Sequence, residues 1–162
     1  MVTTIEKYPL ERRKIIKKTV AGSFAIFIMG IILMIPLWLN IPILNLYATP
    51  LMIIEALFLL YPLIKWLYER EYYKKYFYDI RNDFLVIKKG VFAPNEVTLP
   101  YDKLQDVYVD QDIFDRLFKL YDVHVSTATF MSGMQAHIDG VNKENSELFR
   151  EMILSNIKAH KR

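Results

Sequence analysis

The sequence predicts an α+β membrane protein: a two-helix transmembrane hairpin followed by a small antiparallel β-barrel or bent sheet that a C-terminal helix caps. Three observations predict this class. Residues 19–64 are 46 residues with one charge, apolar and polar residues alternate after Phe77, and helical spacing returns over residues 143–157. The first run is too long for one span, because a bilayer core takes about 20 apolar residues.

Two predicted spans, about Thr19 to Leu39 and about Pro50 to Tyr68, flank an interruption rich in proline and asparagine. A buried hairpin of a soluble protein is the alternative, but a soluble chain of 162 residues rarely encloses so long a charge-poor run. The second helix is expected to continue through the basic, aromatic connector. The predicted divisions are a basic N-terminal segment (1–18), the hairpin with its connector (19–75) and a cytoplasmic domain (76–162).

The charges are segregated along the chain. Residues 1–75 carry a net +5 and residues 76–162 a net −2, which does not favour a nucleic-acid-binding domain. Both flanks of the hairpin are basic and its turn has no Lys or Arg, so the positive-inside rule predicts a multi-pass protein of the cell membrane with both termini cytoplasmic. The residues predicted to face anionic lipid headgroups are Arg12, Arg13, Lys14, Lys17, Lys18, Arg70, Lys74 and Lys75.

Glu55 is the only charge in the apolar run. It lies five residues after Pro50, about 7.5 Å along a helix at 1.5 Å per residue. There its carboxylate can reach the outer interface, where a helix N-terminus favours negative charge. The alternative is an intramembrane site for a proton, an ion or a partner, because acids inside a span are often functional.

The C-terminal half predicts several short strands and two helices. Alternation or a strand-like composition marks residues 77–81, 84–89, 96–100, 106–110, 123–127 and 136–140, with a tight turn at Asn82-Asp83. Residues 113–120 suit a short helix, and residues 143–157 have apolar side chains at helical spacing. We expect residues from Tyr76 onward to fold without the hairpin.

Catalytic chemistry finds no support in the sequence. There is no cysteine, no phosphate-binding loop and no zinc-protease motif, so we predict no enzyme, no cofactor and no metal site. His124 and His137 can come close on adjacent strands, but they lack the spacing of a ligand pair on a helix. The acidic residues Asp106, Asp110, Asp112 and Asp115 are interpreted as a solvated rim, because no calcium-loop pattern surrounds them.

The order of short motifs in this half resembles a known family. Val97-Thr98-Leu99-Pro100, Leu104-Gln105-Asp106-Val107, Ile113 to Phe118, Val123 to Ala128 and Ile138 to Val141 are similar to the bacterial pleckstrin-homology-like (PH-like) domains attached to membrane hairpins, the DUF304 or YdbS-like group. Lys119 stands where members often have glycine. The resemblance implies a PH-like barrel more firmly than an activity. The first hairpin, at Arg81-Asn82-Asp83, is too short and acidic for a phosphoinositide cradle.

These features favour a membrane-anchored interaction or scaffold module that binds a protein partner or assembles with itself. The candidate partner surface is Val123, Val125, Thr127, Met131 and Met134, because an edge strand accepts an added strand and methionines adapt to partners. Two alternatives stay open: a sensor of anionic lipid that uses the basic flanks, and a small transport or toxin-resistance component that uses Glu55.

Overall fold

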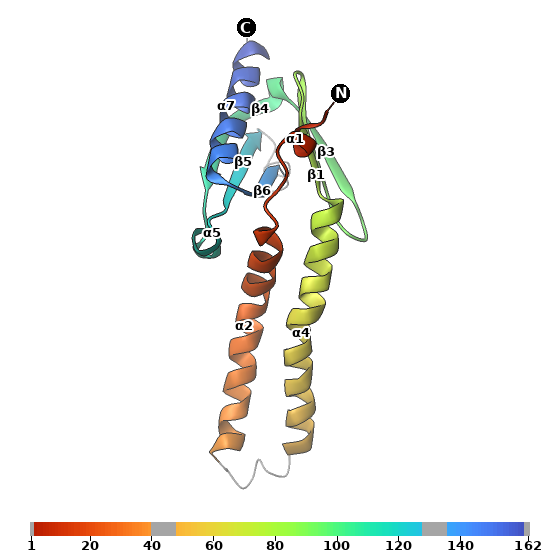
Figure 1. Cartoon of the computed structure of the whole chain (residues 1–162), viewed down its shortest axis with the longest axis vertical. Helices are drawn as coiled ribbons and strands as arrows, with labels where there is room; N and C mark the ends of the chain where they lie inside the picture. The colour runs from red at the N-terminus through yellow and green to blue at the C-terminus, as the bar shows by residue number, and fades with distance from the viewer. Residues whose placement is uncertain (1, 40–47, 128–135, 161–162) are drawn as a thin grey trace. The chain divides into compact units, whose positions relative to one another are not determined.

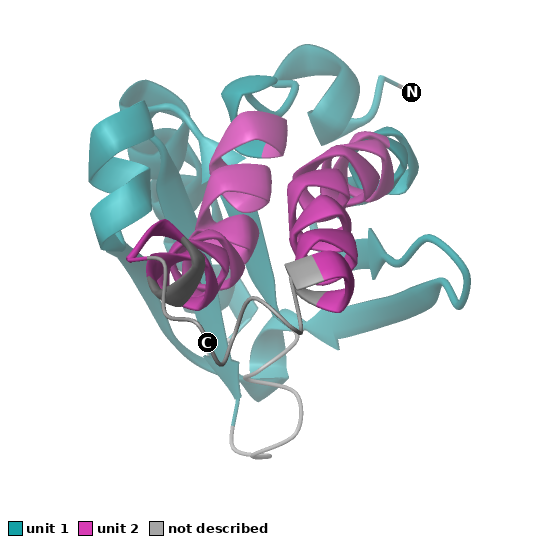
Figure 2. Cartoon of the chain, turned by 90° about the horizontal axis from the view of Figure 1, so that it is seen from below, with its two compact units in different colours: residues 1–14, 71–162 teal, residues 15–70 magenta. Residues whose placement is uncertain are grey.

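The structure is a computed structural model that describes residues 2–39, 48–127 and 136–160. It contains two compact units (Figures 1 and 2). Residues 15–70 form the first, which we call the helical unit, and residues 1–14 and 71–162 form the second, which we call the β domain.

The helical unit is built from two long helices, α2 (Arg13–Trp38) and α4 (Ala48–Lys75), which run side by side (Figure 1). Both predicted helices are present, and α4 continues through the connector as expected. The predicted turn at residues 40–47 lies outside the described residues. By length and composition, one described helix can cross a membrane: residues 13–35, with a mean hydropathy of 2.1.

Glycines of α2 allow the two helices to approach closely. A Cβ on Gly22 would lie 2.7 Å from Cε of Lys65, and one on Gly30 would lie 3.3 Å from Oε2 of Glu55. No side chain larger than hydrogen fits at Gly22 unless Lys65 moves. Small residues permit close helix packing, and Gly22 and Gly30 do so here.

The β domain contains two three-stranded antiparallel sheets, β1-β2-β3 and β4-β5-β6. The strands are β1 (Phe77–Ile80), β2 (Phe84–Lys89), β3 (Asn95–Pro100), β4 (Leu104–Asp110), β5 (Tyr121–Thr127) and β6 (His137–Val141). A short 3-10 helix, η1 (Tyr101–Lys103), joins the sheets, and α5 (Ile113–Phe118) joins β4 to β5. All six predicted strands and the tight turn after β1 are confirmed.

The C-terminal helix α7 (Lys143–His160) packs against β4, β5, η1 and β1. Its apolar residues recur at helical spacing, and Phe149, Ile153 and Ile157 are buried. Phe149 contacts the ring of Tyr78 from β1 at 5.4 Å between centroids. The core that they complete draws on both sheets, so the predicted capping helix closes the β domain as expected.

The N-terminal segment is part of the β domain and not a separate basic tail. Its short helix α1 (Thr4–Lys7) lies against β1, where the Thr4 amide and hydroxyl both donate to Oδ1 of Asp79 at 2.9 Å. Tyr8 packs edge-on against Phe149, and Leu10 is buried in the core. The predicted boundary at Tyr76 therefore differs from the structure, because residues 1–14 also contribute buried contacts.

Candidate binding site: a cationic pocket beside α5

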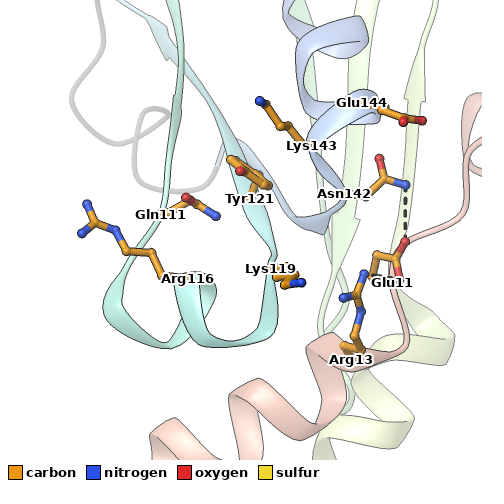
Figure 3. A pocket seen from close by; sticks show the side chains of 9 residues that line it. All are labelled: Glu11, Arg13, Gln111, Arg116, Lys119, Tyr121, Asn142, Lys143 and Glu144. Carbon is orange, nitrogen blue, oxygen red and sulfur yellow. Dashed lines mark hydrogen bonds and ion pairs between the residues drawn. The ribbon is translucent and has the colours of Figure 1, made fainter.

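The β domain contains a pocket of about 520 Å³ beside α5 and the start of α7 (Figure 3). Three separate parts of the chain contribute to it: residues 11–13 at the start of α2, residues 111–121 around α5, and residues 142–144 at the start of α7. The lining side chains are Glu11, Arg13, Gln111, Arg116, Lys119, Tyr121, Asn142, Lys143 and Glu144. Four of the nine are cations and two are carboxylates, so the pocket favours an anionic group.

A capping box holds the short helix α5 at the edge of this pocket. The Asp115 amide donates to Oδ1 of Asp112 at 2.6 Å, and the Asp112 amide donates to Oδ2 of Asp115 at 3.2 Å. Asp115 is buried, so the interpretation of this acid as part of a solvated rim is wrong. Its carboxylate is needed at the N-terminus of the helix, where amide groups have no intrahelical partner.

Lys119 ends α5 in the left-handed conformation, with φ 54° and ψ 46°. Glycine is the usual residue here, because a Cβ costs about 1 kcal/mol in this region. The turn expected of the family is therefore retained although Lys119 replaces the glycine. The substitution places an ammonium group at the pocket, on the residue that reverses the chain into β5.

The charged groups of the pocket differ in how fully they are paired. Glu11 forms an ion pair with Arg13 at 3.2 Å and accepts a hydrogen bond from the side-chain amide of Asn142 at 3.3 Å. Within the described residues, neither Arg116 nor Lys119 forms an ion pair. These two cations are therefore free to meet an incoming anion, and the positive end of the α7 dipole at Lys143 adds to their field.

Exposed aliphatic side chains stand on the same short helix. Ile113 is 84% exposed and Leu117 is 71% exposed, and they lie four residues apart on one face of α5. Single exposed apolar residues are common on protein surfaces, but two neighbouring large aliphatic side chains form a small apolar patch. An apolar pair thus lies next to two cations that have no ion pair among the described residues. The sequence pattern predicts only a short helix over residues 113–120 and does not indicate this combination.

The basic residues predicted to face lipid do not behave alike. Arg12, Arg70, Lys74 and Lys75 are exposed, with Lys74 paired to Glu71 and Lys75 bonded to the Val91 carbonyl. Lys18 is partly buried and Lys17 buried, while Arg13 lines the pocket. Lys14 is buried and pairs with Asp139 at 2.7 Å, so its assignment to a lipid contact is wrong.

The predicted partner strand is also placed differently. β5 is the central strand of its sheet, between β4 and β6, so its backbone is not available for strand addition. Val123 and Val125 are buried in the core and Thr127 is partly buried. The pattern of alternation was the same for an edge and a central strand, which is why the sequence could not separate them. Met131 and Met134 lie outside the described residues.

Glu55 lies in the helical unit, facing α2 at Gly30. Its Oε2 atom is enclosed and accepts no hydrogen bond from the residues that the structure describes. The carboxylate therefore lies against α2 and does not extend outward as predicted. Its role as a proton, ion or partner site stays a prediction.

The sequence model of the bacterial PH domain matches residues 15–157. The chain belongs to the bacterial PH domain family. PH-like domains are typically interaction modules without catalytic activity, and the two sheets and closing helix of the β domain agree with the fold that the resemblance implied. Comparisons with curated proteins and with solved structures gave no match.

Proposed function

We propose that this protein is a membrane-anchored PH-like interaction module that binds an acidic segment of a protein partner at the pocket beside α5. The helical unit inserts as a hairpin with both termini in the cytoplasm, so that the β domain works at the inner face of the membrane. One observation carries the proposal. Arg116 and Lys119, which form no ion pair within the described residues, lie next to the exposed Ile113 and Leu117 on α5 and its C-cap.

The mixed lining of the pocket favours a peptide over a phospholipid headgroup. Glu11 and Glu144 would repel a phosphate, whereas a peptide offers amide donors to carboxylates as well as acidic side chains to Arg116 and Lys119. The exposed aliphatic pair adds the apolar contact that protein interfaces place at their centre. Tethering at the membrane raises the local concentration, so a modest contact at the β domain is sufficient.

A photo-crosslinking experiment in native membranes tests this proposal. Benzoylphenylalanine at Ile113 is expected to give a discrete crosslinked protein, which mass spectrometry identifies. The same probe at Lys158, an exposed residue near the end of α7, is the position control. Arg116→Glu with Lys119→Glu should abolish the adduct at Ile113, while the charge-matched pair Lys103→Glu with Lys158→Glu, both exposed, should retain it.

The variant Lys119→Gly tests whether the charge of Lys119, and not the folding of α5, is needed for the adduct. Glycine suits the left-handed conformation, so this variant should keep the stability of the parent or gain up to about 1 kcal/mol, and yet lose much of the adduct.

The lipid alternative has its own variant, Arg12, Arg70, Lys74 and Lys75→Gln, which removes exposed cations and leaves the pocket intact. If this variant alone loses the adduct while it is correctly inserted, the protein is a sensor of anionic lipid and the proposal is wrong. Retention of the adduct in the Arg116/Lys119 variant would also contradict it.

A further inference from the structure

One face of the second sheet carries two rows of polar side chains across its three strands. The register places Asp110 opposite Asp122 and Asp122 opposite Asp139, which makes one row of three carboxylates. It also places Tyr108 opposite His124 and His124 opposite His137 in the neighbouring row. Because residues two apart share a face of a strand, both rows lie on the same side of the sheet.

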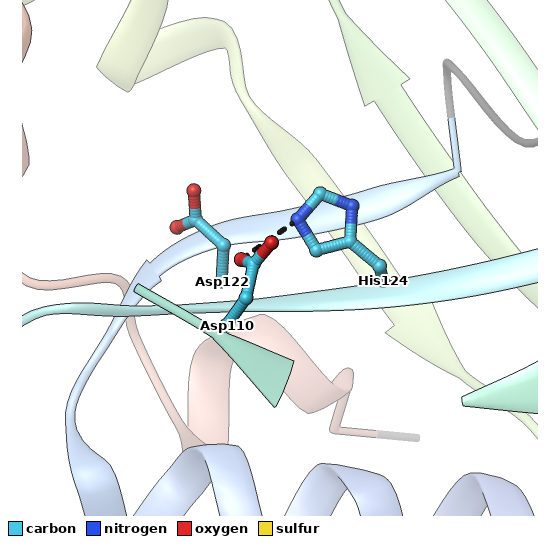
Figure 4. Close-up of side chains that lie close together, drawn as sticks. All are labelled: Asp110, Asp122 and His124. Carbon is cyan, nitrogen blue, oxygen red and sulfur yellow. Dashed lines mark hydrogen bonds and ion pairs between the residues drawn. The ribbon is translucent and has the colours of Figure 1, made fainter. Parts of the chain in front are cut away.

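Three carboxylates abreast are unfavourable without nearby positive charge, since like charges directly opposite on adjacent strands destabilise a sheet. Lys14 supplies that charge to Asp139 at 2.7 Å. At the other end of the row, Asp110 and Asp122 lie directly opposite each other with His124 beside them (Figure 4). This end of the row brings two carboxylates and an imidazole together.

The side chains at this end converge. The ligand atoms of Asp110, Asp122 and His124 all lie within 4.8 Å of one another, and Nε2 of His124 is 3.1 Å from Oδ1 of Asp110. Two ligand atoms that each bind one metal ion at about 2.1 Å stand roughly 3.0 to 3.4 Å apart in octahedral or tetrahedral geometry. The His124–Asp110 pair already has that separation, and the ligand atom of Asp122 lies within 4.8 Å of both.

Groups around the cluster fix the orientation of its members. The His124 ring is stacked between the rings of Tyr108, at 5.0 Å, and His137, at 5.2 Å. The Gly140 amide donates to Oδ1 of Asp122 at 2.8 Å, which holds that carboxylate in place. Lys89, 3.1 Å from Nδ1 of His137, is the cation on the far side of the stack from Tyr108. Supporting contacts of this kind orient ligands before a metal arrives.

We propose that Asp110, Asp122 and His124 form a binding site for a divalent transition-metal ion of the Zn²⁺ type. Two carboxylates neutralise the charge of the ion, and the imidazole nitrogen suits zinc, cobalt or nickel over magnesium or calcium. Asp110 is exposed, so water completes the coordination. The two histidines do not act as a ligand pair. His124 binds with the two aspartates, and His137 supports its ring.

Isothermal titration of the full-length chain in detergent micelles, with any affinity tag removed, tests the site with ZnCl₂ alone. We expect about one ion per chain, and Co²⁺ in its place should give visible d–d absorption. Asp110→Asn and His124→Gln should each weaken binding at least about tenfold. Binding should also weaken at acidic pH, because the ligands bind in their deprotonated forms.

The matched control is another His–Asp pair of the β domain, His160 and Asp83, at 3.5 Å. Asp83→Asn with His160→Gln should leave the affinity unchanged. Circular dichroism melts establish that every variant is folded, and Asp110→Asn is the safest because its side chain is exposed. Three outcomes would overturn the proposal. The chain does not bind Zn²⁺ at millimolar concentration, binding survives both Asp110→Asn and His124→Gln, or the control variant loses as much affinity as these two.

Discussion

Lys14 and Asp139 form an ion pair whose side chains are only 3% and 2% exposed. The Lys14 ammonium also lies 3.8 Å from the centroid of the Tyr76 ring, so the charge is surrounded by the β domain. Gly140 makes room for it, since a Cβ there would lie 2.6 Å from Cδ of Lys14. A residue that sequence patterning assigns to the lipid surface thus belongs to the interior.

Lys14→Met should destabilise the β domain by about 3 to 5 kcal/mol, because it leaves the Asp139 carboxylate buried without its cation. Chemical denaturation followed by circular dichroism measures the change. Adding Asp139→Asn to Lys14→Met should recover part of the loss. The exposed neighbour Arg12→Gln should change stability by less than about 0.5 kcal/mol, and an equal loss in that variant would argue against the buried pair.

Asp79 connects the N-terminal segment to β1 and gives this contact a pH dependence. Burial alone would raise the pKa of Asp79, but hydrogen bonds from Arg81 and Thr4 outweigh it and hold the pKa below its ordinary value of 3.8. The contribution to stability is therefore complete above about pH 4 and is lost as the pH falls through the lowered pKa. Acid should loosen this segment.

Asp79→Asn should flatten the fall in unfolding free energy between about pH 4 and pH 2, because the variant has no carboxylate to protonate. Equilibrium denaturation at a series of pH values gives the slope. Asp102→Asn, on an exposed aspartate of η1, is the control and should retain the slope of the parent. Identical slopes in the parent and Asp79→Asn would show that other acids govern the acid response.

At the scale of elements, the β domain depends on a segment that the helical unit separates from it in sequence. Besides the Thr4 contacts with β1, the Tyr73 hydroxyl donates to the Leu10 carbonyl at 2.6 Å and the Tyr78 hydroxyl donates to the Tyr8 carbonyl. Burial raises the pKa of Tyr78, so this hydroxyl stays protonated as a donor across the working pH range. The N-terminal segment therefore contributes both hydrogen bonds and a buried side chain, Leu10, to the β domain.

A fragment of residues 71–162 should melt at a lower temperature or fail to melt cooperatively, because Leu10 and Lys14 no longer cover its core. A synthetic peptide of residues 1–14 added in trans should restore a cooperative transition, and a peptide with Leu10→Asp should not. Thermal melts by circular dichroism compare the three samples. Full stability of the fragment alone would contradict an essential N-terminal segment.

At the scale of the whole molecule, the shared use of residues 1–14 and 71–162 constrains topology. Both ends of the helical unit lead into the same β domain, so the two ends must lie on the same side of any membrane that the unit crosses. The basic flanks predict that this side is the cytoplasm. A single crossing by α2 alone would separate the two parts of one core.

Reporter fusions test this topology. Alkaline phosphatase fused before residue 1 or after Arg162 should be inactive, and green fluorescent protein at either place should fluoresce, because both ends are expected in the cytoplasm. Phosphatase inserted at residue 44, between the helices, should be active. Phosphatase activity at one terminus only would indicate a single crossing and would contradict the hairpin.

The sequence by itself determined the local structure of this protein. Long apolar runs predicted α2 and α4, alternation predicted the six strands, and helical spacing predicted α7, because each pattern depends on residues close along the chain. The order of short motifs was sufficient to identify the PH-like fold. Even the proximity of His124 and His137 followed from strand adjacency.

Only the tertiary structure decided what depends on distant pairing. Lys14 is buried because Asp139 lies beside it, 125 residues later in the sequence. β5 is central because β4 and β6 both pair with it, and alternation does not report the number of neighbours. The cationic pocket and the Asp110–Asp122–His124 cluster likewise assemble from separate elements. Their side chains acquire a shared environment only when strand register and helix packing bring them together.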